Sequence, residues 1–376
     1  MNYILTGIQA LNHIAQGIIH YSDNRLLHSD EQTLSEIGTF SLKFFFRLIF
    51  ILYYEDLSVN KSIDNLNDQF NKSHEVSWVI STDHLSKAIH LTKSLMEYLR
   101  SNIKNLGKFY EQLLEYKLVF NDGELRYEKK GESKKVSGTF YTPDYIVEYI
   151  VNNTLGPTIE RLCQKAEIKG ESRLQAILDI KVLDPAMGSG IFLLYAFDFL
   201  TEKYHRVLEE KEMYNYESIK ERILDNCIYG ADSDEIAVDI ARFSLSHKAQ
   251  RRNKIISNVN HHLKHDNSLF IKWKFKFDVV LGNPPYIDSE GMSISHSELR
   301  AYCNKHFETA QGNWDLYIIF IELALQLAKE NGIVSQIIPN KILAAEYATV
   351  VRKKMLEYTI TRIRDYSSVK VFNIDV

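Results

Sequence analysis

Four consecutive residues, Asn283, Pro284, Pro285 and Tyr286, have types that could do chemistry. Two prolines in a row fix φ and remove two N–H donors, so the carbonyl oxygens of this loop should face outward in a rigid arc of acceptors. The Asn283 side chain adds a neutral carbonyl, and Tyr286 adds an aromatic face. Such a loop suits an exocyclic amino group on a flat ring, because two carbonyls can accept its hydrogens while the tyrosine stacks on the ring.

This arrangement would make a poor amine nucleophile usable, because it draws the nitrogen lone pair out of conjugation with the ring. A strongly electrophilic methyl donor with an adenosine part and an amino-acid carboxylate would complete the reaction. No general base is obligatory, since the amine becomes acidic as it gains the methyl group. We expect the donor to lie against the turn Gly188–Gly190, with its ribose on Asp232.

The turn Asp184–Gly190 reads Asp-Pro-Ala-Met-Gly-Ser-Gly and precedes an apolar helix that opens at Ile191. Glycines at a strand-to-helix turn let a ligand approach the backbone and leave N–H groups at the helix start to meet an anionic group. A dinucleotide fingerprint would need a third glycine where Leu193 stands, which disfavours a nicotinamide enzyme. A tight turn that binds nothing is the alternative.

Two other predicted strand ends carry polar side chains. Asp232 could accept hydrogen bonds from a ribose diol, whereas Asp234 is placed to cap the helix that follows. Asp266 and Asn267 follow a later strand region and could bind the edge of an adenine. These residues alone do not choose between Asp266 and Asn267.

Metal and disulfide chemistry find little support. His261, His262 and His265 lie close together but lack a companion acid at ligand spacing, so an exposed polar loop is favoured over a metal site. The cysteines are far apart and form no C-x-x-C pair, which excludes a local zinc module or disulfide framework. We expect buried thiols in a reducing compartment, the cytoplasm.

The strand ends belong to an alternation of short apolar runs and helical patterns that begins at Gly138. This alternation predicts a mostly parallel sheet with helices on both faces, whose ligands lie beyond the carboxyl ends of the strands. The expected strands are residues 180–183, 228–231, 277–281, 333–338 and 360–363. The expected helices between them are residues 237–249, 316–327 and 343–356.

The first 142 residues contain no proline, and their apolar stripes have helical spacing, so we predict an all-helical domain over residues 1–130. The apolar stretch Phe40–Tyr54 carries two basic residues and is shorter than the roughly 20 apolar residues of a membrane span, which predicts a buried helix. Thr33 and Glu36 could form a capping box before it. A polar and basic connector, Asn121–Ser137, leads into the second domain, residues 131–376.

The chain has 376 residues, of which 45% are hydrophobic and 25% charged, as in folded proteins of about two domains. Its first residues lack the features of a signal peptide. The net charge of −4 does not indicate a dedicated nucleic-acid binder, so such contacts would use local patches. Lys248–Lys254 and Arg352–Lys354 are candidates, although solvated helix ends explain both.

Taken in order, these motifs resemble those of gamma-class DNA adenine-N6 methyltransferases. Gly138–Pro143 looks like the family's element before the glycine loop, and Asp184–Gly190 resembles its S-adenosylmethionine loop. Asp232 matches the ribose-binding acid, and Asn283–Tyr286 matches the catalytic signature. Phe109–Leu114 resembles the helical connector of large single-chain type IIG restriction-modification enzymes.

The resemblance implies a Rossmann-like, S-adenosylmethionine-dependent enzyme that methylates adenine N6 in double-stranded DNA, within a restriction-modification or phage-defence system. Asn283 and the Pro284 carbonyl would hold the N6 of a flipped adenine, next to Pro285, and Tyr286 would stack on it. The cofactor would be bound by Tyr141, Thr142, Pro143, Asp184, Ala186, Gly188, Gly190 and Asp232, with Asp266 or Asn267 at its adenine.

Two features depart from the family. The chain stops at Val371–Val376, where a last strand should begin and a target-recognition domain should follow. We therefore expect a partial chain that binds cofactor better than it methylates DNA, completed by a C-terminal segment or a second polypeptide. Glu115-Tyr116-Lys117 fits a minimal nuclease pattern but falls in the predicted helical connector, so we expect no nuclease activity.

Other functions stay open. The same loop could serve a methyltransferase acting on a protein glutamine or an RNA guanine, although such relatives generally lack the Tyr141–Pro143 element, which favours DNA. A catalytically weak or non-catalytic subunit, whose partner recognises the DNA, is a further alternative.

Overall fold

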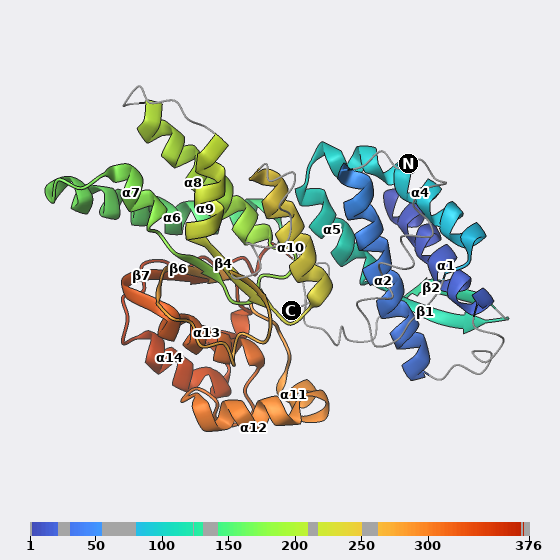
Figure 1. The fold of residues 1–376 in the computed structure, drawn as a ribbon. Helices are drawn as coiled ribbons and strands as arrows, with labels where there is room; N and C mark the ends of the chain where they lie inside the picture. Colours follow the sequence, from blue (N-terminus) through green and yellow to red (C-terminus); the bar gives the residue numbers. More distant parts are fainter. Residues whose placement is uncertain are drawn as a thin grey trace. The chain divides into compact units, whose positions relative to one another are not determined.

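The computed structural model describes residues 2–21, 31–54, 80–122, 124–130, 142–209, 217–249, 262–369 and 371. The chain divides into two compact units, Met1–Ser133 and Lys134–Val376 (Figure 1).

The first unit is mostly helical. Its helices are α1 (Tyr3–Tyr21), α2 (Glu31–Tyr54), α4 (Thr82–Ser101) and α5 (Lys104–Leu113). The apolar stretch from Phe40 forms part of α2 and is buried, as predicted, with Phe44 and Phe45 fully inaccessible. In the part of the chain that the structure describes, no helix is long and apolar enough to cross a membrane. The capping-box prediction is wrong, because α2 begins at Glu31 and Thr33 lies inside it.

A β-hairpin corrects the all-helical prediction for this unit. β1 (Tyr116–Asn121) pairs antiparallel with β2 (Glu124–Lys129), where a polar connector was expected. Leu125 and Tyr127 alternate with exposed charged residues and point into the unit, where the Tyr127 hydroxyl donates to the Gly38 carbonyl at 3.0 Å. Glu115-Tyr116-Lys117 therefore enters a strand and not a helix. The strand β2 was not predicted because only two of its positions are buried, and the charged residues around them hide the alternation of apolar and polar residues that marks a strand.

The second unit contains a five-stranded parallel sheet in the order β5-β4-β3-β6-β7. The Rossmann-like fold prediction is confirmed. The strands are β3 (Val182–Asp184), β4 (Ile228–Asp232), β5 (Leu263–His265), β6 (Phe277–Gly282) and β7 (Ala328–Gln336).

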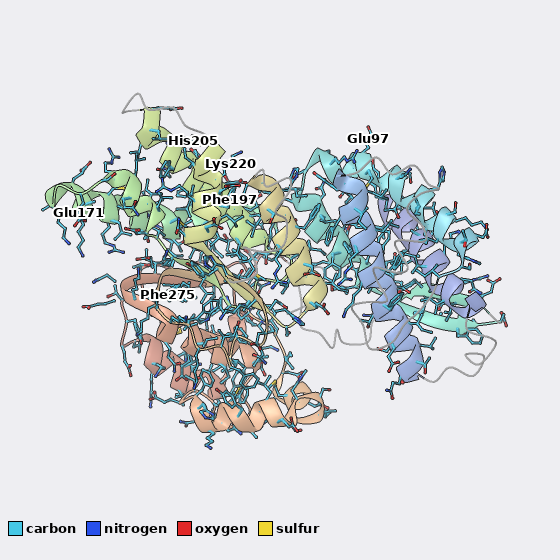
Figure 2. All side chains as sticks on the ribbon, viewed as in Figure 1. Glu97, Glu171, Phe197, His205, Lys220 and Phe275 are labelled. Carbon is cyan, nitrogen blue, oxygen red and sulfur yellow. The ribbon has the colours of Figure 1, made fainter. Side chains whose placement is uncertain are left out.

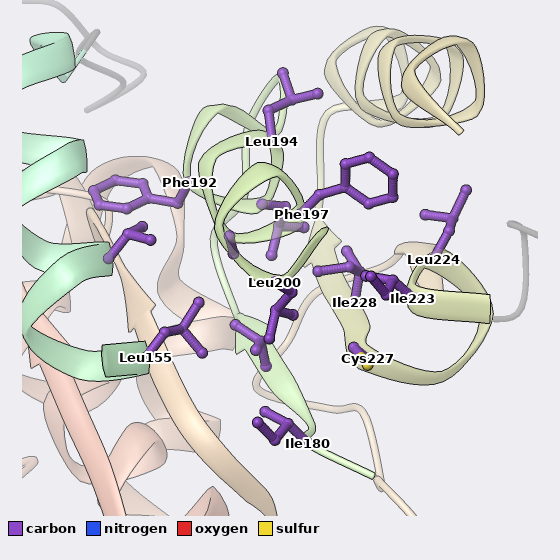
Figure 3. Close-up of a cluster of buried hydrophobic side chains, with 14 of the residues drawn as sticks. Leu155, Ile180, Phe192, Leu194, Phe197, Leu200, Ile223, Leu224, Cys227 and Ile228 are labelled. Atoms are coloured by element: carbon purple, nitrogen blue, oxygen red, sulfur yellow. The ribbon is translucent and has the colours of Figure 1, made fainter. Parts of the chain in front are cut away.

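Alternate residues of the strands pack on opposite faces of the sheet. Val182 and Val279 belong to a large core with α6 (Asp144–Ile168), α8 (Ile191–Glu209), α9 (Glu217–Cys227) and α10 (Glu235–Lys248) (Figure 3). Leu183 and Val280 face the other side, towards α13 (Leu316–Leu327). Figure 1 shows these two helical layers, and Figure 2 shows the side chains that fill the space between them. The remaining helices are α7 (Arg173–Leu178), α11 (Ser289–Ser295), α12 (Ser297–His306) and α14 (Thr349–Met355).

Two predictions within this unit need correction, and a third was incomplete. β5 has three residues and lies in the strand region expected before Asp266, for which no bounds were predicted. The helix expected at 343–356 is instead two 3-10 turns, Asn340–Leu343 and Glu346–Ala348, followed by the short α14. Residues 360–363 form no strand, because Ile360 and Ile363 are exposed and Arg362 between them donates to the Tyr149 hydroxyl of α6 at 3.1 Å.

Candidate active site

The predicted site residues of the second unit follow three neighbouring strands. β3 pairs in parallel with β4 on one side and with β6 on the other, with Asp184 opposite Gly230 and Leu183 opposite Val280. The carboxyl ends of parallel strands lie at one edge of a sheet, so the loops after Asp184, Asp232 and Gly282 meet there.

Asp184 is a buried carboxylate at this edge, with 1% of its surface exposed. Its Oδ1 accepts the Ala186 N–H at 3.0 Å, while its Oδ2 has no hydrogen-bond partner among the described residues. Burial and, to a smaller extent, the nearby Asp232 carboxylate raise the pKa of Asp184 to about 8, although the Ala186 N–H favours the charged form. An unpartnered oxygen in such a position is costly to fold and is well suited to a cationic ligand.

Gly282, the last residue of β6, makes room for that carboxylate. Its φ is +146°, and a Cβ at this position would lie 2.4 Å from Asp184 Oδ1. No other residue fits there without displacing Asp184. The sequence prediction missed Gly282, although a glycine at the end of a buried strand is a recognisable sign of close approach.

The two glycines of the Asp184–Gly190 turn have different surroundings. Gly188 has φ +50° and open space where a Cβ would stand, and its N–H donates to Asp232 Oδ2 at 2.8 Å. Gly190 has φ +86°, and a Cβ there would lie 2.8 Å from the Ala241 Cβ of α10. Gly190 is therefore required for helix packing, whereas the space at Gly188 is available to a ligand.

Asp232 stands at the end of β4 and is half-buried. Its two oxygens accept the N–H groups of Gly188 and Asp234, at 2.8 and 2.9 Å, and burial raises its pKa. Each carboxylate oxygen can accept a second hydrogen bond, so a diol fits beside these backbone contacts. Asp234 caps α10 by accepting from Ile236 and Ala237, as predicted.

The structure distinguishes the environments of Asp266 and Asn267 after β5. Asn267 Oδ1 accepts the Leu269 N–H at 3.0 Å and so holds the turn. Asp266 is exposed; its N–H donates to the Asp232 carbonyl at 3.0 Å and its Oδ1 accepts the Asn267 N–H at 2.7 Å.

The nearby histidines have structural partners. His265 Nε2 lies 3.1 Å from the Ser233 carbonyl oxygen, and the His262 ring stacks on Tyr229 at 4.2 Å. His261 lies outside the described residues. Across the described ranges, no group of three or more histidine, cysteine or acidic side chains is arranged to hold a metal.

Asn283 and Thr142 meet although 141 residues separate them. Asn283 Nδ2 donates to Thr142 Oγ1 at 3.2 Å, and Thr142 is buried just before Pro143, the N-cap residue of α6. The start of α6 is thereby joined to the proline loop. Tyr141, like residues 138–140, lies outside the residues that the structure describes.

The proline loop is anchored through its aromatic residue. Pro284 is buried, and Pro285 is half-buried. The Tyr286 hydroxyl donates to the Ile337 carbonyl, just after β7, at 2.8 Å, and burial raises its pKa above the ordinary value. The loop is thus tied to both β6 and the end of β7.

Most described members of the candidate phosphate patches bind other protein groups. Lys248 pairs with Asp198 at 2.7 Å, and Lys354 pairs with Glu308 at 2.5 Å. Arg352 donates to the carbonyls of Ile342 and Ala345, each at 2.8 Å. Residues 250–254 lie outside the described part of the chain.

Comparison with known families identifies the same region. A family model described as "Eco57I restriction-modification methylase" matches residues 226–372, which include Asp232 and the proline loop. The type II restriction enzyme and methyltransferase RM.Eco57I of Escherichia coli is 25% identical over 352 residues, covering 83% of this chain and 34% of the relative. The type II methyltransferase M.BstVI of Geobacillus stearothermophilus is 26% identical, covering 65% of this chain and 41% of the relative. The chain spans less than half the length of either relative.

Solved structures share the fold. The type IIL restriction-modification enzyme MmeI, solved in complex with DNA, superposes with a TM-score of 0.58 at 13% identity, covering 93% of this chain and 53% of MmeI. The ATP-dependent type ISP restriction-modification enzyme LlaBIII, bound to DNA, gives a TM-score of 0.55 at 16% identity, covering 95% of this chain and 26% of LlaBIII.

Proposed function

We propose that this chain, which carries an Eco57I-like restriction-modification methylase domain, transfers a methyl group from S-adenosylmethionine to adenine N6 in double-stranded DNA. The observation that carries the proposal is the junction of the proline loop with the Asp184–Gly190 turn. Gly282, directly before Asn283, packs against the Asp184 carboxylate, so the amine site and the donor site share one edge of the sheet.

The residues of the turn fit the donor. Asp184 offers a buried, unpartnered carboxylate oxygen to the cationic methionine part, next to the open space at Gly188. Asp232 retains acceptor capacity for the ribose hydroxyls. When bound, S-adenosylmethionine supplies an electrophilic methyl group on a sulfonium.

Thr142, Pro143 and the turn after β5 would complete the donor site. Between the two candidates for the donor's adenine, we favour the carboxylate of Asp266, because Asn267 Oδ1 already accepts from the Leu269 N–H. Ala186 contributes through its N–H, which fixes one oxygen of Asp184.

Asn283 is oriented for an amine. Because Nδ2 donates to Thr142, the Oδ1 of the same amide points in the other direction, where it can accept an N6 hydrogen together with the Pro284 carbonyl. These acceptors hold N6 as it gains the methyl group and loses a proton to water. Tyr286 supplies the face on which the flipped adenine stacks.

We propose that DNA recognition comes from further sequence or a second polypeptide, and that the system acts in restriction-modification or defence in the cytoplasm, where its DNA is found. A weakly active subunit that depends on a partner for DNA recognition is the alternative.

Incubation with labelled S-adenosylmethionine and separate pools of DNA, RNA and protein tests the proposal. We expect label on N6-methyladenine in DNA, lost in Asn283→Ala, with donor binding by calorimetry preserved. Label in RNA or protein alone would overturn the choice of DNA. Donor binding without transfer, restored by a recognition polypeptide, would identify the partial subunit.

A further inference from the structure

Asp315 joins the proline loop to α13. This half-buried carboxylate stands one residue before the helix, and its Oδ1 accepts the N–H of Ser289, three residues after Tyr286, at 3.2 Å. The next residue, Leu316, donates its N–H to the Ile287 carbonyl at 2.8 Å. Two backbone contacts therefore hold the exit of the loop against the start of α13.

The other oxygen of Asp315 is connected to Tyr286 of the proline loop through contacts of two further tyrosines. The Tyr347 hydroxyl donates to Asp315 Oδ2 at 2.8 Å and lies 3.3 Å from the Tyr317 hydroxyl. Since Tyr347 uses its proton on a carboxylate, its oxygen is the acceptor for Tyr317. The fully buried Tyr317 ring meets Tyr286 edge to face, with centroids 6.3 Å apart and planes at 90°.

These contacts form a circuit that starts at Ser289, the first residue of α11, and ends at Tyr286 in the proline loop. The hydrogen bond from Tyr286 to Ile337 lies on the axis about which the ring rotates, so it fixes the hydroxyl position without choosing the ring plane. The perpendicular contact with Tyr317 does distinguish between planes, because aromatic pairs prefer edge-to-face geometry. Tyr317 is in turn held at its hydroxyl by Tyr347.

We propose that Asp315 and Tyr347 are positioning residues that set the plane of the Tyr286 ring for stacking on the substrate base. This inference rests on the proposed function, in which Tyr286 is the stacking residue. In this circuit the Tyr317 hydroxyl donates to Tyr347, and the Tyr347 hydroxyl donates to Asp315. Both hydrogen bonds require a carboxylate at position 315 and a hydroxyl at position 347. Neither residue has to touch the substrate for this role.

Tyr347→Phe is the direct test, because it deletes one hydroxyl and keeps the ring. We expect kcat for methylation of mixed-sequence DNA to fall about tenfold, with KM and Kd for the donor within twofold of the unsubstituted protein. Tyr286 labelled as 3-fluorotyrosine should show a shifted or broadened ¹⁹F resonance in the same variant. Asp315→Asn, which removes one carboxylate acceptor, should change both readouts in the same direction.

Tyr149→Phe is the matched control. Tyr149 lies on α6, outside the circuit, and the substitution removes a hydroxyl that accepts a hydrogen bond from Arg362. It should leave both the kcat and the Tyr286 resonance unchanged. A Tyr286 resonance that is identical in the unsubstituted, Tyr347→Phe and Asp315→Asn proteins would overturn the positioning role, whatever the kcat. Absence of DNA methylation by the unsubstituted protein, both alone and with a recognition polypeptide, would count against the proposed function, and the resonance would still decide the positioning.

Discussion

Asp278 and Asp184 are buried carboxylates at opposite ends of neighbouring strands, and they differ in how many hydrogen-bond donors the protein gives them. Asp278, at the amino end of β6, accepts the Lys181 N–H at 2.9 Å and the Lys329 ammonium at 2.8 Å. Asp184, at the carboxyl end of β3, accepts one N–H and leaves Oδ2 without a partner in the described ranges. Both side chains are less than 8% exposed. The fold gives the Asp278 carboxylate two donors and leaves one oxygen of Asp184 without a partner at the edge where we propose that a cationic donor binds.

The largest effect is expected at the carboxyl edge. Asn283→Ala removes an acceptor for the developing positive charge on N6, so methyl transfer should fall by about 10²–10³-fold. Donor affinity by calorimetry should barely change. Asn226→Ala, which removes a half-buried amide beside the amino end of β4, is the control and should leave transfer intact. Loss of donor binding in Asn283→Ala would contradict the role given to the loop.

The next effect concerns the donor itself. Asp232→Ala should weaken donor binding by about 1.5–3 kcal/mol, because charge-assisted bonds to the ribose are lost and the Gly188 N–H loses its acceptor. Asp232→Asn retains one acceptor oxygen, so its loss of affinity should be smaller. Equal affinities of the unsubstituted protein and Asp232→Ala, measured by calorimetry, would exclude the diol contact.

Asp278→Ala should have the opposite phenotype. It leaves the partly buried Lys181 N–H without an acceptor and Lys329 without its ion pair, so the free energy of unfolding should fall by about 2 kcal/mol. Lys329 is 41% exposed and can return to water, which limits the loss. Denaturant unfolding measures the change, and donor affinity at a temperature where the variant is folded should be unaltered. Asp179→Ala, an exposed carboxylate on the same unit, is the control.

Much of this edge was predictable because parallel strands bring distant loops to one place. Asp184, Asp232 and Asn283 each follow a short buried apolar run, and that regularity alone implies that they share a sheet edge. The hydrogen bond between Asn283 and Thr142 was not predicted, because no local pattern links side chains 141 residues apart.

The elements that escaped prediction are short or are determined by tertiary contacts. The bounds of β5 could not be predicted, because it has three residues and one buried side chain, too few for a periodic signal. The apolar residues around Arg362 looked like a strand, yet the guanidinium contact with Tyr149 draws this segment along α6 with its isoleucines exposed. The Asp315 circuit depends on hydroxyl geometry between segments about 30 residues apart, which composition and spacing do not encode.

The burial of Asp184 should also make donor binding depend on pH. A pKa of about 8 means that Asp184 holds a proton at neutral pH, and a cationic donor must displace that proton to bind. Donor affinity should therefore rise about tenfold per pH unit between pH 6 and 7.5, before the donor's own ammonium titrates. Calorimetry in two buffers of different ionisation enthalpy should detect the released proton.

The raised pKa of Asp184 should also make the stability of the donor-free protein depend on pH. The folded Asp184 keeps a proton that the unfolded chain has lost, so the free energy of unfolding should fall as the pH rises from about 4 to about 8 and then level off. Asp184→Asn should flatten both pH profiles, while Asp278→Asn should leave the affinity profile intact. An affinity that did not change with pH in the unsubstituted protein would show that Asp184 is ionised before the donor arrives, and the contrast with Asp278 would then lie in hydrogen bonding alone.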